Sequence, residues 1–163
     1  MVFLTEKQWD NIGVRHHHGV ALSLGSLHSQ STAGCGDLST LKELLPLLSS
    51  FGFDILQLLP LNDSGFDASP YMAMSGYALH PLYLSLPALP NFFDSNERAS
   101  LWKTIQEENA GSRPLFSFQR VVQQKWDLLC HYLNEHQKVL EESSDFCLFC
   151  NENADWLEPY SAF

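Results

Sequence analysis

Two groups of side chains in the sequence have the residue types of a metal site. Three consecutive histidines at 16–18 offer imidazole nitrogens, which are common zinc ligands. Cys147 and Cys150 have the Cys-x-x-Cys spacing of half a zinc site, with His131 and His136 upstream. However, adjacent strand residues point to opposite faces, and no Gly-rich knuckle surrounds the cysteines. We therefore interpret the histidines as a polar turn and the cysteines as buried members of an apolar helix face, and we expect no metal.

Carboxylates and glycines offer further candidates for chemistry. Asp63 and Asp67 could form the carboxylate pair of a glycoside-cleaving enzyme, although solvated loop carboxylates are the commoner case. The segment Gly34-Cys35-Gly36-Asp37 precedes an expected helix, but a phosphate loop needs a longer glycine pattern and a Lys-Ser/Thr pair. We interpret this segment as a tight turn and a helix cap. The residues thus indicate no cofactor.

The elements around these candidates predict an α/β protein. Two short apolar runs, 19–25 and 54–60, suit strands that are buried on both faces. Leucines recur every three or four residues between them, which indicates an amphipathic helix with Asp37 as its N-cap and Gly52 as its stop. Pro46 lies within this pattern and is expected to kink or shorten the helix. Two such strands joined by a helix predict a parallel pair.

A long loop and three helices are expected after the second strand. Residues 62–91 are rich in proline, glycine and tyrosine, and a loop of this length after a strand is usually functional. Helices are expected at 96–106, 118–140 and 146–156. The apolar residues expected to form the buried stripe of the second helix are Val122, Trp126, Leu129, Leu133 and Leu140.

Composition limits the possible partners and compartments. The chain has 163 residues, of which 45% are hydrophobic, and a formal net charge of −10. An acidic protein lacks the basic surface that nucleic-acid backbones require. No apolar run reaches the ~18–20 residues that span a bilayer, and residues 1–10 lack the pattern of a secretory signal. The four unevenly spaced cysteines do not form a disulfide framework. We expect a cytoplasmic protein with free thiols that binds neither membrane nor nucleic acid.

Several motifs occur together in an order that matches a known enzyme family. They are Ser26-Leu27, Gly34-Cys35-Gly36-Asp37-Leu38, Gln57-Leu58-Leu59-Pro60-Leu61, Ser69-Pro70-Tyr71 and His80-Pro81-Leu82-Tyr83-Leu84. A later Val-x-x-x-Lys helix around Lys125 and the segment 146–163 also look similar. Over about residues 9–163 the chain resembles the N-terminal portion of the 4-α-glucanotransferases (amylomaltases, or disproportionating enzymes) of glycoside hydrolase family 77.

The resemblance implies a TIM (β/α)8 barrel with a helical insertion, of which this chain holds about two strands and hence an incomplete barrel. Residues 1–95 would be the first β/α units with the sugar-binding loop, and residues 96–163 the insertion. The family acts on α-1,4-glucans by a retaining mechanism without a cofactor. Tyr71 and Ser69 match its substrate-binding loop. None of the motifs that carry its catalytic carboxylates occurs in this chain, so we expect those carboxylates beyond Phe163 and assign no catalytic residue.

Two departures from the family pattern fall in these motifs. His80 replaces the usual asparagine before Pro81, which puts a local hydrogen bond of the loop in doubt, and Cys35 replaces an isoleucine. Two strands alone have open edges, so this chain on its own is expected to be marginally folded or prone to aggregation. The alternatives are a non-catalytic or non-functional glucan-binding remnant and, least favoured, an unrelated α/β binding protein.

Overall fold

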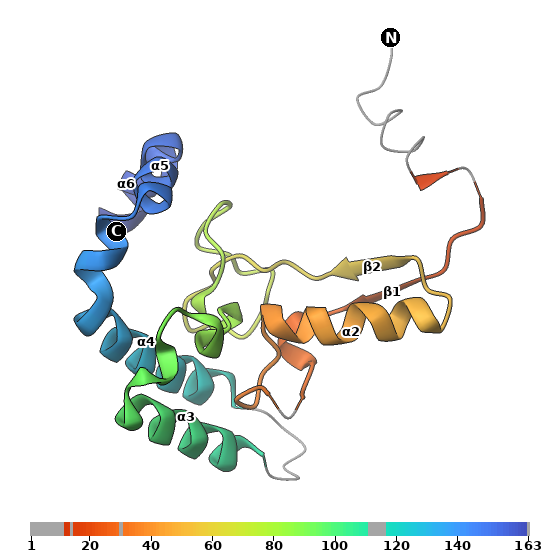
Figure 1. Ribbon diagram of the computed structural model, residues 1–163. Helices are drawn as coiled ribbons and strands as arrows, with labels where there is room; N and C mark the ends of the chain where they lie inside the picture. Colours follow the sequence, from red (N-terminus) through yellow and green to blue (C-terminus); the bar gives the residue numbers. More distant parts are fainter. Residues whose placement is uncertain (1–11, 14, 30, 111–116, 163) are drawn as a thin grey trace.

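The computed structural model describes residues 12–13, 15–29, 31–110 and 117–162 (Figure 1). The regular elements run in the order β1 (Gly19–Leu22), α2 (Leu38–Ser50), β2 (Ile55–Leu58), α3 (Asn96–Asn109), α4 (Phe118–Glu141), α5 (Ser144–Glu152) and α6 (Ala154–Ala162). Four single-turn 3-10 helices join them: η1 (Leu24–Ser26), η2 (Pro81–Tyr83), η3 (Leu86–Ala88) and η4 (Phe92–Asp94).

Two of the expectations from the sequence fall on residues outside these ranges. One is the expectation of no secretory signal, which rests on residues 1–10. The other is the expectation that the catalytic carboxylates of the family lie beyond Phe163, because Phe163 is itself outside the described residues. The structure therefore tests neither, and both stay predictions.

The two strands form a parallel pair, as predicted. Gly19 is in register with Ile55, and Leu22 with Leu58. Both strands alternate between exposed and half-buried residues, so the prediction that they are buried on both faces is wrong for this chain. The reason is that each strand has only one neighbouring strand within the described residues, whereas a barrel strand has one on each side. Figure 1 shows α2 lying alongside the pair.

Helix α2 begins where its capping residues predict. The Asp37 carboxylate accepts the amides of Ser39 and Thr40, and the Thr40 hydroxyl accepts the Asp37 amide, which completes a capping box. Gly52 follows the helix with a left-handed φ of 82°. Pro46 does not shorten the helix, which continues to Ser50. The fixed φ of proline is itself helical, although Pro46 removes one backbone hydrogen bond and its ring crowds the carbonyl four residues earlier.

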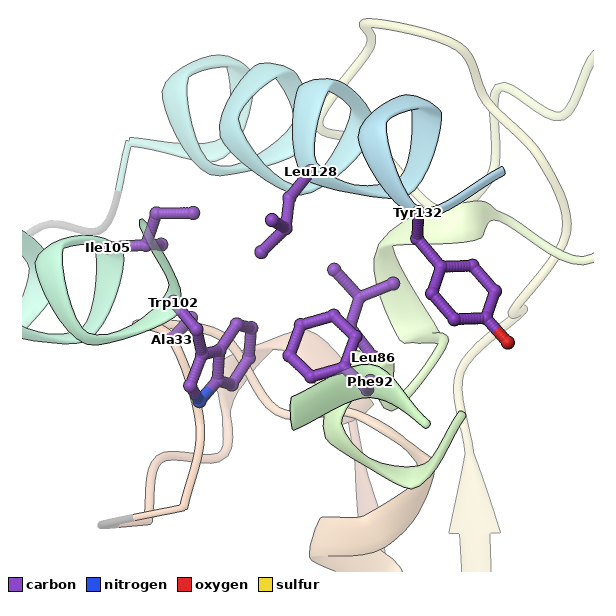
Figure 2. Close-up of a cluster of buried hydrophobic side chains, with 7 residues drawn as sticks. All are labelled: Ala33, Leu86, Phe92, Trp102, Ile105, Leu128 and Tyr132. Atoms are coloured by element: carbon purple, nitrogen blue, oxygen red, sulfur yellow. The ribbon is translucent and has the colours of Figure 1, made fainter. Parts of the chain in front are cut away.

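Two buried clusters join the first half of the chain to the helices that follow. The first lies between α3, α4, η3 and η4 and is shown in Figure 2; its members are Ala33, Leu86, Phe92, Trp102, Ile105, Leu128 and Tyr132. The second surrounds η2 and the start of α4; its members are Leu24, Cys35, Leu82, Tyr83, Val121 and Val122. Helix α4 contributes to both clusters and is therefore the central packing element of the described residues.

The buried face of α4 differs from the predicted stripe. Trp126 is 50% exposed and Leu133 is also exposed. The residues of α4 that are buried are Val121, Val122, Lys125, Leu128 and Tyr132. Lys125 can lie on this buried face because its ammonium donates to the carbonyls of Leu82 and Leu84. Burial lowers the pKa of Lys125, although the nearby Asp37 opposes the shift.

The last predicted helix is in fact two helices, α5 and α6, separated at Asn153. The Asn153 side chain donates to the Phe149 carbonyl at 2.8 Å and accepts the indole N–H of Trp156 at 2.9 Å. Cys147 is exposed and Cys150 is half-buried, so the expected burial of these thiols is wrong. The structure describes every residue of α5, and none of them is buried. The helix therefore has no buried face on which the two thiols could pack.

Within the described ranges, no three or more His, Cys, Asp or Glu side chains are grouped to hold a metal ion. The helices of the same ranges include none that is both long and apolar enough to cross a membrane.

Candidate functional site

The loop between Asn62 and His80 follows β2 directly and is closed at its base. An antiparallel bridge pairs Asn62 with Leu79. The Asp63 amide donates to the Ala78 carbonyl, and the His80 amide donates to the Leu61 carbonyl, each at 2.9 Å. The loop therefore starts and ends at one point, beyond the C-terminal end of β2. This is the end of a parallel strand at which α/β proteins place their binding residues.

Within the loop, Ser69 and Tyr71 occupy different environments. The Ser69 amide donates to an Asp67 carboxylate oxygen at 2.8 Å, and the Ser69 carbonyl accepts the Met72 amide at 3.1 Å. Ser69 is thus half-buried within a turn, whereas Tyr71 at the tip of this turn is 70% exposed. The turn presents the Tyr71 ring to solvent, where an aromatic face can pack on an apolar ligand surface and the hydroxyl can form hydrogen bonds.

His80 supports the loop from beneath, contrary to the doubt that its substitution raised. The buried ring accepts the Leu82 amide at Nδ1 (3.0 Å), which caps η2, and lies 2.8 Å from the Gly65 carbonyl through Nε2. A carbonyl only accepts, so Nε2 carries the proton and Nδ1 is free to accept. Histidine therefore links η2 to the loop with both ring nitrogens.

Asp63 and Asp67 hold the loop with their carboxylates. Asp67 accepts the Ser69 amide, and one oxygen of Asp63 accepts the Gly65 amide at 2.8 Å. The other Asp63 oxygen accepts the hydroxyl of Tyr160 in α6. Burial and this bond to a carboxylate raise the pKa of Tyr160 to about 12, so the phenol remains a donor at neutral pH. These contacts account for both carboxylates as structural groups of the loop.

A cavity of about 430 Å³ lies between this loop and α4. Its lining is mostly apolar and includes Phe66 and Met74 from the loop and Trp126 and Leu129 from α4. Sequence reasoning missed this cavity because it assigned Trp126 to the buried stripe. Trp126 and Phe66 are both exposed and contribute aromatic rings to the lining of this cavity.

A parallel strand pair with a helix between the strands, followed by a loop that closes beyond the end of the second strand, defines an α/β architecture. Residues 22–163 match the glycoside hydrolase family 77 profile, whose description is 4-alpha-glucanotransferase. The chain belongs to this family. Membership implies a TIM-barrel-type fold, of which the described residues show a two-stranded parallel sheet with helices.

Individual relatives agree with the family match. The chain is 35% identical to a 4-alpha-glucanotransferase of Chlamydia caviae, over 97% of this chain and 30% of that protein. It is 38% identical to the Chlamydia pneumoniae 4-alpha-glucanotransferase, over 95% of this chain and 29% of that protein. It is 33% identical to the 4-alpha-glucanotransferase DPE2 of Oryza sativa subsp. japonica, over 89% of this chain and 16% of that protein. The chain thus spans less than a third of the length of these relatives.

Proposed function

We propose that this chain forms the first part of the catalytic barrel of a 4-α-glucanotransferase, which moves segments of α-1,4-glucan from one glucan to another. The observation that carries the proposal is the family match over residues 22–163 together with the Ser69-Pro70-Tyr71 turn at the end of β2. In this assignment β1 and β2 are two of the eight barrel strands. The cytoplasm is the proposed compartment.

The proposed chemistry is a retaining transfer. One carboxylate attacks the sugar and forms a glycosyl-enzyme, a second acts as acid and then base, and an acceptor glucan takes the place of water. The family motifs that carry these carboxylates are absent from this sequence, and in the proposed assignment they belong to barrel strands beyond Phe163. We therefore place no catalytic residue in this chain and assign it to substrate binding. The mechanism calls for neither a metal nor a cofactor.

Tyr71 and Ser69 are the proposed substrate-binding residues. The exposed ring of Tyr71 offers a face for the apolar side of a glucose unit, and its hydroxyl can bond sugar hydroxyls. Ser69 holds the turn through its amide and carbonyl, which leaves its hydroxyl available to the substrate side. In the proposed division of the chain, residues 1–95 carry this loop and residues 96–163 form the helical insertion.

Two measurements on the purified chain test these assignments. Incubation with maltotriose is expected to release no glucose, and glucose release would contradict the absence of a catalytic residue. Titration with maltoheptaose, followed by nuclear magnetic resonance, is expected to show binding that Tyr71→Ala weakens about three- to tenfold. Phe51→Ala is the matched control, because Phe51 is 69% exposed at the end of α2. Equal affinities for the two variants would refute the role of Tyr71.

A further inference from the structure

Helix α6 contacts both limbs of the loop that carries Tyr71. On the first limb, Asp63 accepts the hydroxyl of Tyr160. On the second limb, the ring of Tyr77 stacks on that of Trp156, with centroids 5.7 Å apart and planes inclined by 16°. Tyr71 lies between these two contacts in sequence. The turn that presents Tyr71 is therefore held on either side by one helix.

Asp63 is the point at which the first contact reaches the rest of the loop. Its carboxylate accepts the Gly65 amide at 2.8 Å, and its carbonyl accepts the Met74 amide at 2.7 Å. A hydrogen bond to its other carboxylate oxygen restricts the rotation of this side chain. Tyr160 thus stabilises a junction that ties the two limbs of the loop together.

The second contact is made by the indole ring of Trp156, and residues of α5 and of its junction with α6 hold this ring in its orientation. The indole N–H of Trp156 donates to the Asn153 side chain at 2.9 Å, and Phe149 packs against the indole with planes inclined by 82°. Helices α5 and α6 lie beyond the end of α4, as Figure 1 shows. Helix α4 is in turn anchored through Lys125 to the carbonyls that follow the loop.

We propose that α6 is a clamp that positions Tyr71 for glucan, with Tyr160 and Trp156 as its positioning residues. The clamp rests on the proposed function of Tyr71 as a glucan-binding residue. In this proposal α6 contributes to the affinity for glucan through the position of Tyr71. Neither Tyr160 nor Trp156 is proposed to touch the sugar. Without the clamp, the loop samples other conformations and the affinity falls by the fraction of time spent in them.

Amide hydrogen exchange of the full 163-residue chain, without ligand, tests the clamp itself. Tyr160→Phe removes the hydroxyl and keeps the ring, and we expect the Gly65 and Met74 amides to exchange about tenfold faster. Tyr132→Phe is the matched control, because its hydroxyl bonds the Pro90 carbonyl at 3.0 Å and lies outside the loop. Unchanged loop exchange in Tyr160→Phe, or the same increase in the control, would overturn the proposal.

Maltoheptaose affinity tests whether the clamp acts on Tyr71. Tyr160→Phe is expected to lower the affinity about threefold in the wild-type background and not at all in a Tyr71→Ala background. Asp63→Asn leaves one side-chain oxygen for two donors, the Gly65 amide and the Tyr160 hydroxyl, and is expected to lose at least as much affinity as Tyr160→Phe. Equal losses in the two backgrounds would refute positioning. If the unaltered chain binds no maltoheptaose, the proposed glucan site is wrong, and the exchange experiment alone then decides whether α6 clamps the loop.

Discussion

Arg98 is the most buried charged side chain in the part of the chain that the structure describes, at 1% exposure, and its replacement gives a sharp test of the packing. Its guanidinium donates to the Phe92 carbonyl at 2.9 Å, to the Asn91 carbonyl at 3.0 Å and to Glu135. It also lies 5.6 Å from the centre of the Tyr132 ring. Arg98→Met keeps much of the volume and removes every donor.

The expected cost follows mainly from the Phe92 carbonyl. The Asn91 carbonyl also accepts the Asp94 amide at 3.1 Å, so of the two only the Phe92 carbonyl loses its donor, which lowers the free energy of unfolding by about 1–3 kcal/mol. Glu135 can return to water because its side chain is exposed, so it adds little. With an m-value of about 2 kcal/mol/M, the urea midpoint falls by about 0.5–1.5 M.

Urea unfolding followed by tryptophan fluorescence measures this shift; of the four tryptophans, Trp102 is buried in the cluster that contains Phe92 and Tyr132 (Figure 2). Lys103→Met on the same helix is the control, because Lys103 and Glu107 form an exposed pair and the midpoint should not move. A midpoint for Arg98→Met equal to that of the control would show that the Phe92 carbonyl needs no protein donor, and the reasoning would fail.

Three further outcomes are expected. Gly36→Ala places a Cβ 2.2 Å from the Leu24 carbonyl oxygen and should lower the free energy of unfolding by about 1–3 kcal/mol, measured by urea unfolding. Gly76→Ala meets open space and should match the wild type, so equal midpoints for the two variants would contradict this. Burial raises the pKa of the Cys35 thiol to about 12. Iodoacetamide at pH 8 should therefore modify the exposed Cys147 and spare Cys35, as mass spectrometry would show. Equal labelling of the two thiols would refute this. The Gly13 carbonyl and Asp54 raise the pKa of His17, so its contribution to stability is fully present below pH 6.5 and is lost as pH rises through the raised pKa. His17→Asn should therefore flatten the pH dependence of the urea midpoint above pH 6.5, and an unchanged profile would count against the ion pair.

The sequence predicts the elements that local chemistry determines. Asp37 marks the start of α2 because a carboxylate before a leucine-rich run caps it, and Gly52 marks its end because the chain there needs a positive φ. The two apolar runs pair in parallel because the helix between them returns the chain to the start of the sheet, so the second strand runs in the same direction as the first. The assignment of Ser69 and Tyr71 to the substrate remains a prediction.

Features that depend on distant partners could not be predicted. Lys125 interrupts an apolar stripe in the sequence, and only the carbonyls of Leu82 and Leu84 explain why it is buried. A long aliphatic stem lets lysine occupy such a position. The break at Asn153 was also missed, because an asparagine is compatible with a helix until its side chain bonds Phe149 and Trp156.

The bond between Tyr160 and Asp63 joins residues 97 positions apart, which has a consequence for the timing of biosynthesis. Ribosomes add about 5–20 residues per second, so Tyr160 is made roughly 5–20 s after Asp63. The residues of the two strands and of α2 precede Asp63, and the rest of the loop up to His80 is made early in that interval, whereas the helix that holds the loop is made at its end. The loop therefore reaches its final geometry as one of the last events in the synthesis of these 163 residues.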